Sequence, residues 1–450
     1  MLVLKLLLWS IISGLSLAEQ VWRNSNAIRT IDLRSTYTKT LTSLIIVNEG
    51  DEPQNTYRYF QQTSPGESVL SLSVSIKEEE KKGTNPIKVN NNVYDIPLQP
   101  PVKPGESRTL LIQAGLDGGV RPLPAAVDQD EEQYLVYLTT LYLDSPYTTD
   151  LQRTRLILPS AKIDTYTTYN IDGAELPNRV GNTLVYESRE TITGEDNDLG
   201  EIYVRYEHTV PIPRGADLYV QIDMHEYRKM LEVSERVVFE NHAAKLKSNF
   251  DRAKWYMGNF YNPVSTAINR VVYSLPKNSK DVYYTDEVGN ITTSHMRVEP
   301  HQTWIELNPR YPVFGGWNYL FQLDWKMPYE EFRSSKNGRE YLDIPLAWSP
   351  GDMIYEKAVW SYVFPEGATN IEIEMPVEIS NSNVTKIHKF LDTLGRQVFT
   401  YEALNVTDGV PSDIVHISYE YNSSAFFLRI AIITTLLILL AAAAYMIWAP

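Results

Sequence analysis

Apolar and polar residues alternate along most of this chain, so the dominant period of its sequence is two residues. The clearest alternation occurs in residues 70–76, 202–208, 218–224, 371–375 and 415–421. This period is typical of antiparallel strands with one buried face, because successive side chains point to opposite sides of a sheet. Turn signals rich in Gly and Pro separate the stretches. The pattern therefore predicts a mainly β fold of antiparallel, β-sandwich-like domains.

One segment between the two terminal apolar stretches favours a helix, and it helps to place a domain boundary. Residues 242–255 are the best helical candidate, whereas residues 231–239, just before them, alternate like a strand. The roughly 400 residues between the terminal stretches are too many for one hydrophobic core, so we expect two domains. We place these tandem domains at residues 19–227 and 228–424.

The last apolar stretch predicts a membrane-spanning helix. Residues 430–448 contain no charge, proline or glycine. At about 1.5 Å per helical residue, such a stretch just covers a hydrocarbon core of roughly 30 Å. We expect the helix over residues 428–449. The alternative is a lipid-anchor signal with its small-residue site at residues 422–424, although the spacer that follows is short and half aromatic.

The other end of the chain indicates which side of the membrane holds most of the protein. Residues 1–18 carry one basic residue, Lys5, followed by an apolar stretch and by small residues at Ser16 and Ala18. This order is typical of a secretory signal peptide and predicts cleavage between Ala18 and Glu19, with an uncleaved anchor as the alternative. The two ends together predict a single-pass type I protein with its bulk in the lumen.

Net charge and cysteine content narrow the possible functions. The formal net charge is −15, and no cluster of Lys and Arg stands out. Nucleic acid is therefore not an expected partner. The chain contains no cysteine. Its sequence thus excludes thiol catalysis, disulfide exchange and Cys-based zinc sites, and its stability must come from core burial.

Four Asn-x-Ser/Thr triplets are candidate N-glycosylation sites in a lumenal protein. They begin at Asn290, Asn383, Asn405 and Asn422. We expect the first three on surface loops or strand edges. Asn422 lies so close to the predicted membrane helix that we do not expect it to be modified.

The common catalytic and metal-binding motifs are largely missing from the sequence. His225 and the Glu after it begin like a zinc-protease helix, but Lys229 occupies the position of the second histidine. The carboxylates of residues 128–130 and 196–198 have a spacing that can hold a divalent ion, yet their acidic, turn-like surroundings favour solvated loops. We therefore expect neither a metal nor a cofactor. A two-carboxylate glycosidase stays open, because its acid and base come from distant strands.

Several long stretches resemble a known family. Residues 281–295 read DVYYTDEVGNITTSH, and residues 308–319 read NPRYPVFGGWNY. Three further blocks follow the same family's order: residues 29–34 leading to Asn48 and Asp51-Glu-Pro53, residues 364–371 (FPEGATNI) and residues 390–396 (FLDTLGR). The chain strongly resembles the ribophorin I family, subunit 1 of the oligosaccharyltransferase complex. It departs from the animal pattern because no sizeable cytosolic domain follows the membrane helix, as in the fungal form.

The resemblance implies a function without catalysis in this chain. It implies a subunit of the endoplasmic-reticulum complex that transfers a preassembled glycan from dolichyl diphosphate to asparagine in Asn-x-Ser/Thr sequons. The implied partners are the multi-span catalytic subunit, other subunits of the complex and nascent polypeptide. Stabilising the catalytic subunit and guiding substrate are the implied roles. The alternatives are a free-standing lumenal glycosidase and a receptor-like ectodomain.

In such a complex the membrane helix has a second expected role, because membrane helices associate through small and polar residues. One helical face carries Ala431, Thr434, Thr435, Ile438 and Ala442. We expect this face to dock against a partner helix.

Overall fold

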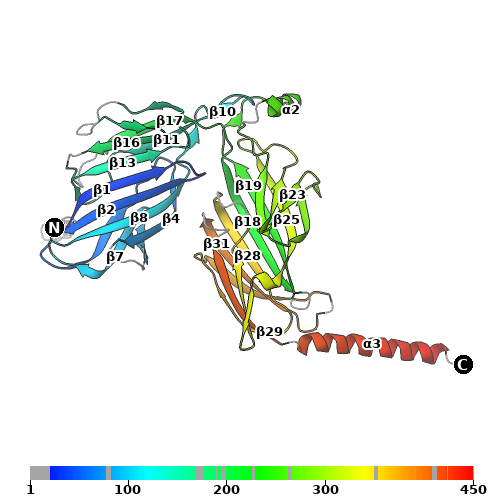
Figure 1. Ribbon diagram of the computed structural model, residues 1–450. Coiled ribbons are helices and arrows are strands. Elements are labelled where there is room, and N and C mark those ends of the chain that lie inside the picture. The colour runs from blue at the N-terminus through cyan, green and yellow to red at the C-terminus, as the bar shows by residue number, and fades with distance from the viewer. Residues whose placement is uncertain are drawn as a thin grey trace, which may run out of the picture. The chain divides into compact units, whose positions relative to one another are not determined.

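The computed structural model describes residues 21–77, 83–168, 176–188, 191–193, 199–225, 229–261, 265–348, 353–390, 392–407, 413–422 and 424–448 (Figure 1). Their secondary structure is almost entirely strand, which confirms the predicted mainly β fold. The chain forms two compact units. Unit 1 comprises Met1–Val127 and Glu131–Thr209, and unit 2 comprises Asp128–Asp130 and Val210–Pro450. The predicted signal peptide, with its cleavage site, lies outside the described residues.

Unit 1 contains one large sheet and two smaller sheets among its described residues. In spatial order the large sheet consists of β15 (Asn178–Val180), β16 (Thr183–Ser188), β13 (Gln152–Ile157), β1 (Trp22–Asp32), β2 (Thr38–Asn48), β8 (Ser107–Asp117), β4 (Ser68–Ile76) and β5 (Gly83–Thr84), and β12 (Thr148–Thr149) also pairs with β1. The second sheet consists of β14 (Ile163–Tyr166), β17 (Glu201–Glu207), β11 (Tyr134–Thr140) and β9 (Arg121–Pro122). The third consists of β3 (Gln54–Phe60), β7 (Val93–Val102) and β6 (Ile87–Asn90).

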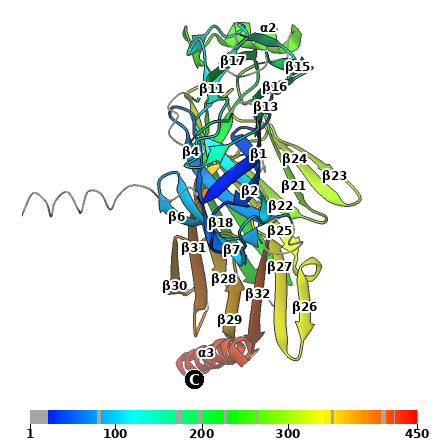
Figure 2. The ribbon, with the colours of Figure 1, turned by 90° about the vertical axis from the view of Figure 1, so that its left-hand side faces the viewer.

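Unit 2 is organised in the same way. Its large sheet consists of β22 (Lys280–Asp286), β25 (Asn318–Pro328), β19 (Met230–Asn241), β18 (Pro213–His225), β28 (Tyr355–Val363), β31 (Arg396–Val406) and β30 (Asn381–Ile387). A four-stranded sheet consists of β26 (Arg333–Lys336), β27 (Arg339–Pro345), β32 (Ile414–Tyr421) and β29 (Ala368–Glu374). A three-stranded sheet of β21 (Val271–Pro276), β24 (Gln302–Leu307) and β23 (His295–Val298) stands out to one side, with β23 at its edge (Figure 2).

Four further elements lie outside these sheets. They are β10 (Ala126–Val127), β20 (Lys245–Leu246), the helix α2 (Arg252–Tyr261) and a 3₁₀ turn at Tyr329–Glu331. The chain then ends in the long helix α3 (Ser424–Trp448). Within α3, Ile430–Trp448 is long and apolar enough to cross a membrane. Its mean hydropathy is 2.5, and none of this stretch is buried inside the protein.

The two units share one topology, apart from the two-residue strands β5 and β12, which have no counterpart among the described residues of unit 2. The strands of the large sheets correspond in both chain order and spatial order as β1/β18, β2/β19, β4/β22, β8/β25, β13/β28, β15/β30 and β16/β31. The smaller sheets correspond as β9/β26, β11/β27, β14/β29, β17/β32, β3/β21, β6/β23 and β7/β24. Even the exception to antiparallel pairing recurs, because β1 runs parallel to β13 and β18 runs parallel to β28.

A buried asparagine ends β2 and β19 and supports this correspondence at the level of atoms. Asn48 and Asn241 are both fully buried. Asn48 Nδ2 donates to the carbonyl of Val102 at 2.8 Å, and Asn241 Nδ2 donates to the carbonyl of Val313 at the same distance. Each side chain thus satisfies a backbone acceptor that would otherwise be buried without a partner.

The glycine after each of these contacts repeats as well. Gly105 N donates to the carbonyl of Asn48 at 2.8 Å, and Gly316 N donates to the carbonyl of Asn241 at 2.7 Å. Both glycines have a positive φ, 73° and 78°, which residues with a Cβ atom rarely adopt. Equivalent residues thus make equivalent hydrogen bonds in both units, which indicates that the chain contains two copies of one fold.

All five alternating stretches form strands, as predicted. They lie in β4, β17, β18, β29 and β32. In β18, for example, Leu218, Val220, Ile222 and Met224 all face the core and are at most 2% exposed. Unit 2 contains a core formed by these and other apolar residues, and a separate core forms around Leu44, Ile96 and Leu110 in unit 1.

The domain boundary and the internal helix differ from the predictions. The boundary expected between residues 227 and 228 lies outside the described residues, but β18 and β19 on either side pair with each other in unit 2, and the units divide after Thr209. The helix expected over residues 242–255 begins only at Arg252. Ala243 and Ala244 instead run closely past Gly315, where an added Cβ would lie 2.2 Å from their carbonyl oxygens. Asp251 then caps α2 by accepting from Ala253 N at 2.9 Å.

Candidate functional site

The turn that follows β22 is organised by the carboxylate of Asp286. This side chain is only 5% exposed. It accepts hydrogen bonds from the backbone N–H groups of Val288 and Gly289, both at 3.0 Å. Gly289 has a φ of 136°, which favours glycine at this position. The local sequence D-E-V-G thus encodes a tight turn closed over a buried carboxylate.

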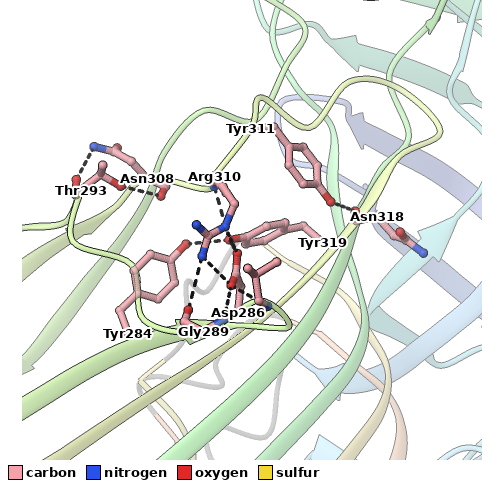
Figure 3. Close-up of polar contacts among 10 residues, drawn as sticks. Tyr284, Asp286, Gly289, Thr293, Asn308, Arg310, Tyr311, Asn318 and Tyr319 are labelled. Atoms are coloured by element: carbon pink, nitrogen blue, oxygen red, sulfur yellow. Dashed lines mark hydrogen bonds and ion pairs between the residues drawn. The ribbon is translucent and has the colours of Figure 1, made fainter.

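Arg310 reaches this carboxylate from a second segment of the chain. Its Nε and Nη2 donate to the two carboxylate oxygens of Asp286 at 2.7 and 2.8 Å, in the two-pronged geometry that suits a guanidinium (Figure 3). The hydroxyl of Tyr319 donates to the same carboxylate at 3.2 Å. Arg310 Nη2 also lies 3.5 Å from the carbonyl of Gly289. The cluster therefore ties residues 286–289 to residue 310 and to β25.

The electrostatics keep this cluster ionised. The Arg310 guanidinium, helped by the N–H groups of Gly289 and Val288, holds the pKa of the Asp286 carboxyl well below its usual range. Burial raises the pKa of Tyr284, and its hydroxyl contact with Tyr319 adds to this effect. Burial likewise raises the pKa of Tyr319. At neutral pH the site thus holds a fixed Asp–Arg pair beside two neutral tyrosines.

A second clamp holds the neighbouring residues of the same segment. Asn308 Nδ2 donates to the carbonyl of Thr293 at 2.9 Å, and Thr293 Oγ1 lies 3.4 Å from the carbonyl of Asn308 (Figure 3). The hydroxyl of Tyr311 lies 3.5 Å from the carbonyl of Asn318. Residues 308–312 are therefore held at both ends and in the middle, so their side chains keep a defined direction.

A series of aromatic rings continues from this clamp to α2. Tyr311 packs edge-on against Tyr319, with ring centroids 5.4 Å apart, and against Trp317 at 6.0 Å. Trp317 packs against Phe314 at 5.7 Å, and Phe314 packs against Trp255 of α2 at 5.4 Å. Edge-to-face pairs of this kind add to the stabilisation from burial alone. They join α2 firmly to the Arg310 segment.

These two segments form the walls of an open cavity of about 790 Å³. It is lined by Phe250, Arg252, Trp255, Tyr256, Asn269, Arg270, Glu306, Asn308, Pro309, Arg310, Tyr311 and Pro312. We call this cavity the α2 groove. Tyr256 and Tyr311 are 63% and 42% exposed. Arg270 forms an ion pair with Glu306, the one carboxylate among the described lining residues, at 3.3 Å.

The chemistry of the α2 groove is that of binding. It offers flat aromatic surfaces, side-chain amides and guanidinium donors, which together suit an elongated polar ligand. Glycoside hydrolysis requires two carboxyl groups facing one bond, and the described lining residues include one, that of Glu306. The nearby Asp286 stays ionised beside Arg310 and is therefore a poor proton donor.

A comparison with known protein families identifies the family of this chain. The family model described as "Ribophorin I" matches residues 22–448. The chain belongs to the ribophorin I family. The two longest stretches that carried the resemblance in sequence, residues 281–295 and 308–319, are those that the Asp286–Arg310 cluster joins in space.

Several members of the family are similar to this chain over most of its length. "Dolichyl-diphosphooligosaccharide–protein glycosyltransferase subunit 1A" of Arabidopsis thaliana is 26% identical over 417 residues, covering 89% of this chain and 65% of that protein. Subunit 1B of Oryza sativa subsp. japonica is 26% identical over 411 residues, covering 88% and 85%. Subunit 1 of Caenorhabditis elegans is 26% identical over 415 residues, covering 91% and 69%. The chain thus spans just under two thirds of the length of the Arabidopsis relative.

The structure places three of the predicted glycosylation asparagines on accessible positions of unit 2. Asn290 is exposed and follows the Asp286 turn. Asn383 is exposed on β30, which pairs only with β31 and so forms a sheet edge. Asn405 is exposed near the end of β31 with a φ of 54°. Their modification stays a prediction.

Asn422 differs from the other three because its side chain is already engaged. Its Oδ1 accepts from Ser424 N at 2.9 Å and so caps the N-terminus of α3. Its backbone N donates to the carbonyl of Gly367 at 3.2 Å. The cap and the neighbouring helix give two physical reasons for our expectation that Asn422 stays unmodified.

The predicted docking face lies on α3, and its two threonines bond within their own helix. Thr434 Oγ1 donates to the carbonyls of Ile430 and Ala431 at 2.9 and 3.0 Å, and Thr435 Oγ1 donates to the carbonyl of Ala431 at 2.7 Å. Ile438 and Ala442 are exposed on the same helix. Because the threonine protons are used internally, we expect this face to dock by close packing of small residues.

The acidic segments considered as metal sites do not form one among the described residues. Asp130 forms an ion pair with Lys254 at 2.6 Å, and Asp128 accepts from Ser248 at 3.2 Å. Residues 196–198 lie outside the described part of the chain. Within that part, no group of three or more His, Asp or Glu side chains could hold a metal ion.

Sequence reasoning missed the Asp286–Arg310 pair and the α2 groove. Both halves of the pair lie in stretches that carried the resemblance, but nothing in the linear sequence shows that they meet. The groove also needs Trp255 and Tyr256, which lie in a segment outside those stretches.

Proposed function

We propose that this chain is a non-catalytic subunit of the endoplasmic-reticulum oligosaccharyltransferase complex. The observation that carries the proposal is the match of the ribophorin I model to residues 22–448, together with relatives named as glycosyltransferase subunits over almost the same span. In this role the chain stabilises the multi-span catalytic subunit, which transfers a preassembled glycan from dolichyl diphosphate to asparagine. The proposed location is the endoplasmic-reticulum membrane, in type I orientation with both units in the lumen.

Purification of the full chain in a mild detergent, followed by mass spectrometry of its partners, tests this proposal. We expect a large multi-span glycosyltransferase among them, and reduced sequon occupancy in cells depleted of the chain. Recovery of the chain without any glycosyltransferase would overturn the proposal. Hydrolytic activity of the purified chain would favour the glycosidase alternative, and cell-surface localisation would favour a receptor-like ectodomain.

The orientation has its own test in the candidate glycosylation sites. In type I orientation Asn290, Asn383 and Asn405 lie in the lumen, where the modifying enzyme acts. We expect glycopeptides covering one or more of these residues and none covering Asn422. Protease digestion of sealed microsomes that removes units 1 and 2 while the vesicles stay intact would contradict the lumenal placement.

We further propose that the α2 groove guides the acceptor polypeptide. An extended polypeptide presents carbonyl oxygens and varied side chains at regular intervals. Exposed aromatic rings such as those of Tyr256 and Tyr311 contact many side chains with little sequence preference, and Arg and Asn donors suit the carbonyls. The ion pairs of Arg270 with Glu306 and of Arg310 with Asp286 offset two of the three arginine charges among the described lining residues, so the surface disfavours strongly basic segments.

A photo-crosslinking amino acid in place of Tyr256 tests the assignment in the intact complex. The matched control is the same amino acid in place of Tyr341, which is 38% exposed and does not line the groove. With a sequon-containing polypeptide as substrate, we expect crosslinks from position 256 and few from position 341. Equal crosslinking from both positions, or crosslinks from position 256 to the glycan alone, would refute polypeptide guidance while leaving subunit membership intact.

A further inference from the structure

The loop between β30 and β31 is held unusually firmly for a surface loop. The side chain of Asp392 is fully buried and accepts from Lys389 N at 2.9 Å and from Arg396 Nε at 2.9 Å. Gly395 has a φ of 75°, and an added Cβ there would lie 2.8 Å from the ring of His388. Lys389 Nζ also donates to Asp223 of β18 at 2.8 Å. The backbone of this loop is thus tied to itself and to the large sheet.

Glu366 fixes the same loop from a different part of the chain. Its Oε1 accepts from Thr393 N at 2.6 Å, from Gly395 N at 3.2 Å and from Leu394 N. Thr393 Oγ1 donates to it as well, at 3.0 Å. Three successive N–H groups pointing at one carboxylate oxygen form a strong, charge-assisted cradle. The stretches 364–371 and 390–396, noted separately in the sequence, therefore form one structural unit.

This firmly built loop displays apolar side chains to solvent. Phe390 is 90% exposed and Leu394 is 48% exposed. The loop buries charged and polar groups to hold its shape, yet it leaves the side chain of Phe390 uncovered. Since water is an unfavourable environment for an exposed phenylalanine, the arrangement indicates a surface that is covered when the protein is in place.

The chain connectivity places this loop close to a membrane. Gly367, next to Glu366, accepts the hydrogen bond from Asn422 N, two residues before α3 begins. From Asn422 to Ile430, where the membrane-spanning stretch starts, the chain reaches at most about 20 Å even with its first residues extended. The loop is therefore tethered near the bilayer surface whatever direction α3 takes. Figure 1 shows β29, which follows Gly367, reaching the start of α3.

We infer that the described residues of this loop, 388–390 and 392–395, form a second membrane contact, in which Phe390 and Leu394 enter the interfacial region of the bilayer. Aromatic and aliphatic side chains are favoured at this depth, between headgroups and acyl chains. Lys386, exposed just before the loop, suits the headgroup phosphates. The contact restrains the tilt of unit 2 on its single helix. The inference rests on α3 crossing a membrane and is independent of any role in glycosylation.

The absence of cysteine from the sequence allows a direct test with a single label. In F390C the new thiol is unique and almost fully exposed, so an environment-sensitive fluorophore attaches without disturbing the packing. The labelled full-length chain is reconstituted in phosphatidylcholine vesicles with and without a lipid carrying a nitroxide near its headgroup. V288C is the matched control, because Val288 is 78% exposed. It lies by the Asp286 turn. Along the strands of the large sheet, this turn is on the side away from the Val363–Val398 pair, which lies next to the β30–β31 loop.

We expect a blue-shifted emission and several-fold stronger quenching by the nitroxide lipid at position 390 than at position 288. L394C should behave like F390C and provides an independent measurement if labelling at residue 390 perturbs the loop. Equal, weak quenching at all three positions, with free access for aqueous iodide, would show that the loop stays in water. A blue shift without lipid quenching would indicate contact with protein. Either result overturns the inference.

Discussion

Replacing Asp286 by asparagine should open the α2 groove locally without unfolding the sheets around it. The carboxylate is the common acceptor for Arg310, Tyr319 and the N–H groups of Val288 and Gly289. In D286N the amide keeps one acceptor oxygen but presents an NH₂ group where Arg310 also donates. Arg310 then loses its partner, and residues 308–312 lose the clamp at their centre.

The expected magnitude follows from the burial and geometry of the pair. Hydrogen bonds to a charged group contribute about 1.5–3 kcal/mol each and are not additive. Loss of one partner from a fully buried ion pair costs about 3–5 kcal/mol. Asp286 is 5% exposed but Arg310 is 41% exposed, so water compensates part of the loss. We expect about 2 kcal/mol, which corresponds to roughly 30-fold faster local opening.

Hydrogen exchange measured by mass spectrometry can detect this opening, because the amides of Val288 and Gly289 report on the bonds being removed. The matched control is D281N on the same strand, where Asp281 pairs with Lys326 at 2.9 Å but is 53% exposed. An exposed pair contributes at most about 1 kcal/mol. Exchange of residues 284–292 that changes equally in both variants, or that accelerates throughout unit 2, would refute a local clamp.

Three further outcomes follow from the structure. Arg310 lowers the pKa of the Asp286 carboxyl in the folded state. The stabilisation by the ionised carboxylate is therefore present above the unfolded pKa of about 4 and is lost as the pH falls through the folded pKa. The difference in exchange between wild type and D286N should shrink as the pH is lowered below about 4. E366Q should weaken the cradle around residues 393–395 by about 1–2 kcal/mol, seen as faster exchange of those amides, while a uniform acceleration across β28 and β31 would argue against a local role. Bulky substitutions on the α3 face, A431L and A442L, should reduce recovery of partner subunits without reducing membrane insertion, and unchanged recovery would count against that face.

The strands were the most predictable part of the fold, and the reason lies in the sheets. Residues such as Leu218 to Met224 alternate because one face of β18 packs on the core while the other meets solvent, so periodicity alone identifies the strand. The position of β18 was less predictable. A strand pattern does not say which strand it pairs with, and β18 joins β19 and β28 rather than the strands before it.

The candidate site was not predictable, because each of its parts is ambiguous alone. Asp286 reads as one acidic residue before a glycine turn, and Arg310 as one basic residue between prolines. The register of β22 on β25 sets Asp286 opposite Phe321, and Arg310 reaches Asp286 from the segment between β24 and β25. The duplication was hidden for a similar reason. Asn48 and Asn241 make equivalent hydrogen bonds in their own units, but the segments that follow β2 and β19 differ greatly in length.

The duplicated fold shows which parts of the α2 groove have a counterpart in unit 1. In both units the strand pairing is interrupted at the same place. In unit 1 residues 98–101 of β7 interrupt its pairing with β3. In unit 2 residues 308–312 separate the end of β24 from the Ile268–Val313 bridge. One wall of the groove thus has a counterpart in unit 1. The other wall does not, since β2 and β3 are joined by residues 49–53, whereas α2 is inserted after β19.

The position equivalent to Asp286 in unit 1 is held by Ile76, which is buried and pairs with Leu110 as Asp286 pairs with Phe321. The shared fold therefore forms with an apolar residue at this position and does not require a charge there. The Asp286–Arg310 pair occurs in the unit where residues 308–312 must face an inserted helix and present Tyr311 to a groove. We expect the pair to shape that surface, so its loss should affect the groove strongly and the sheets only weakly.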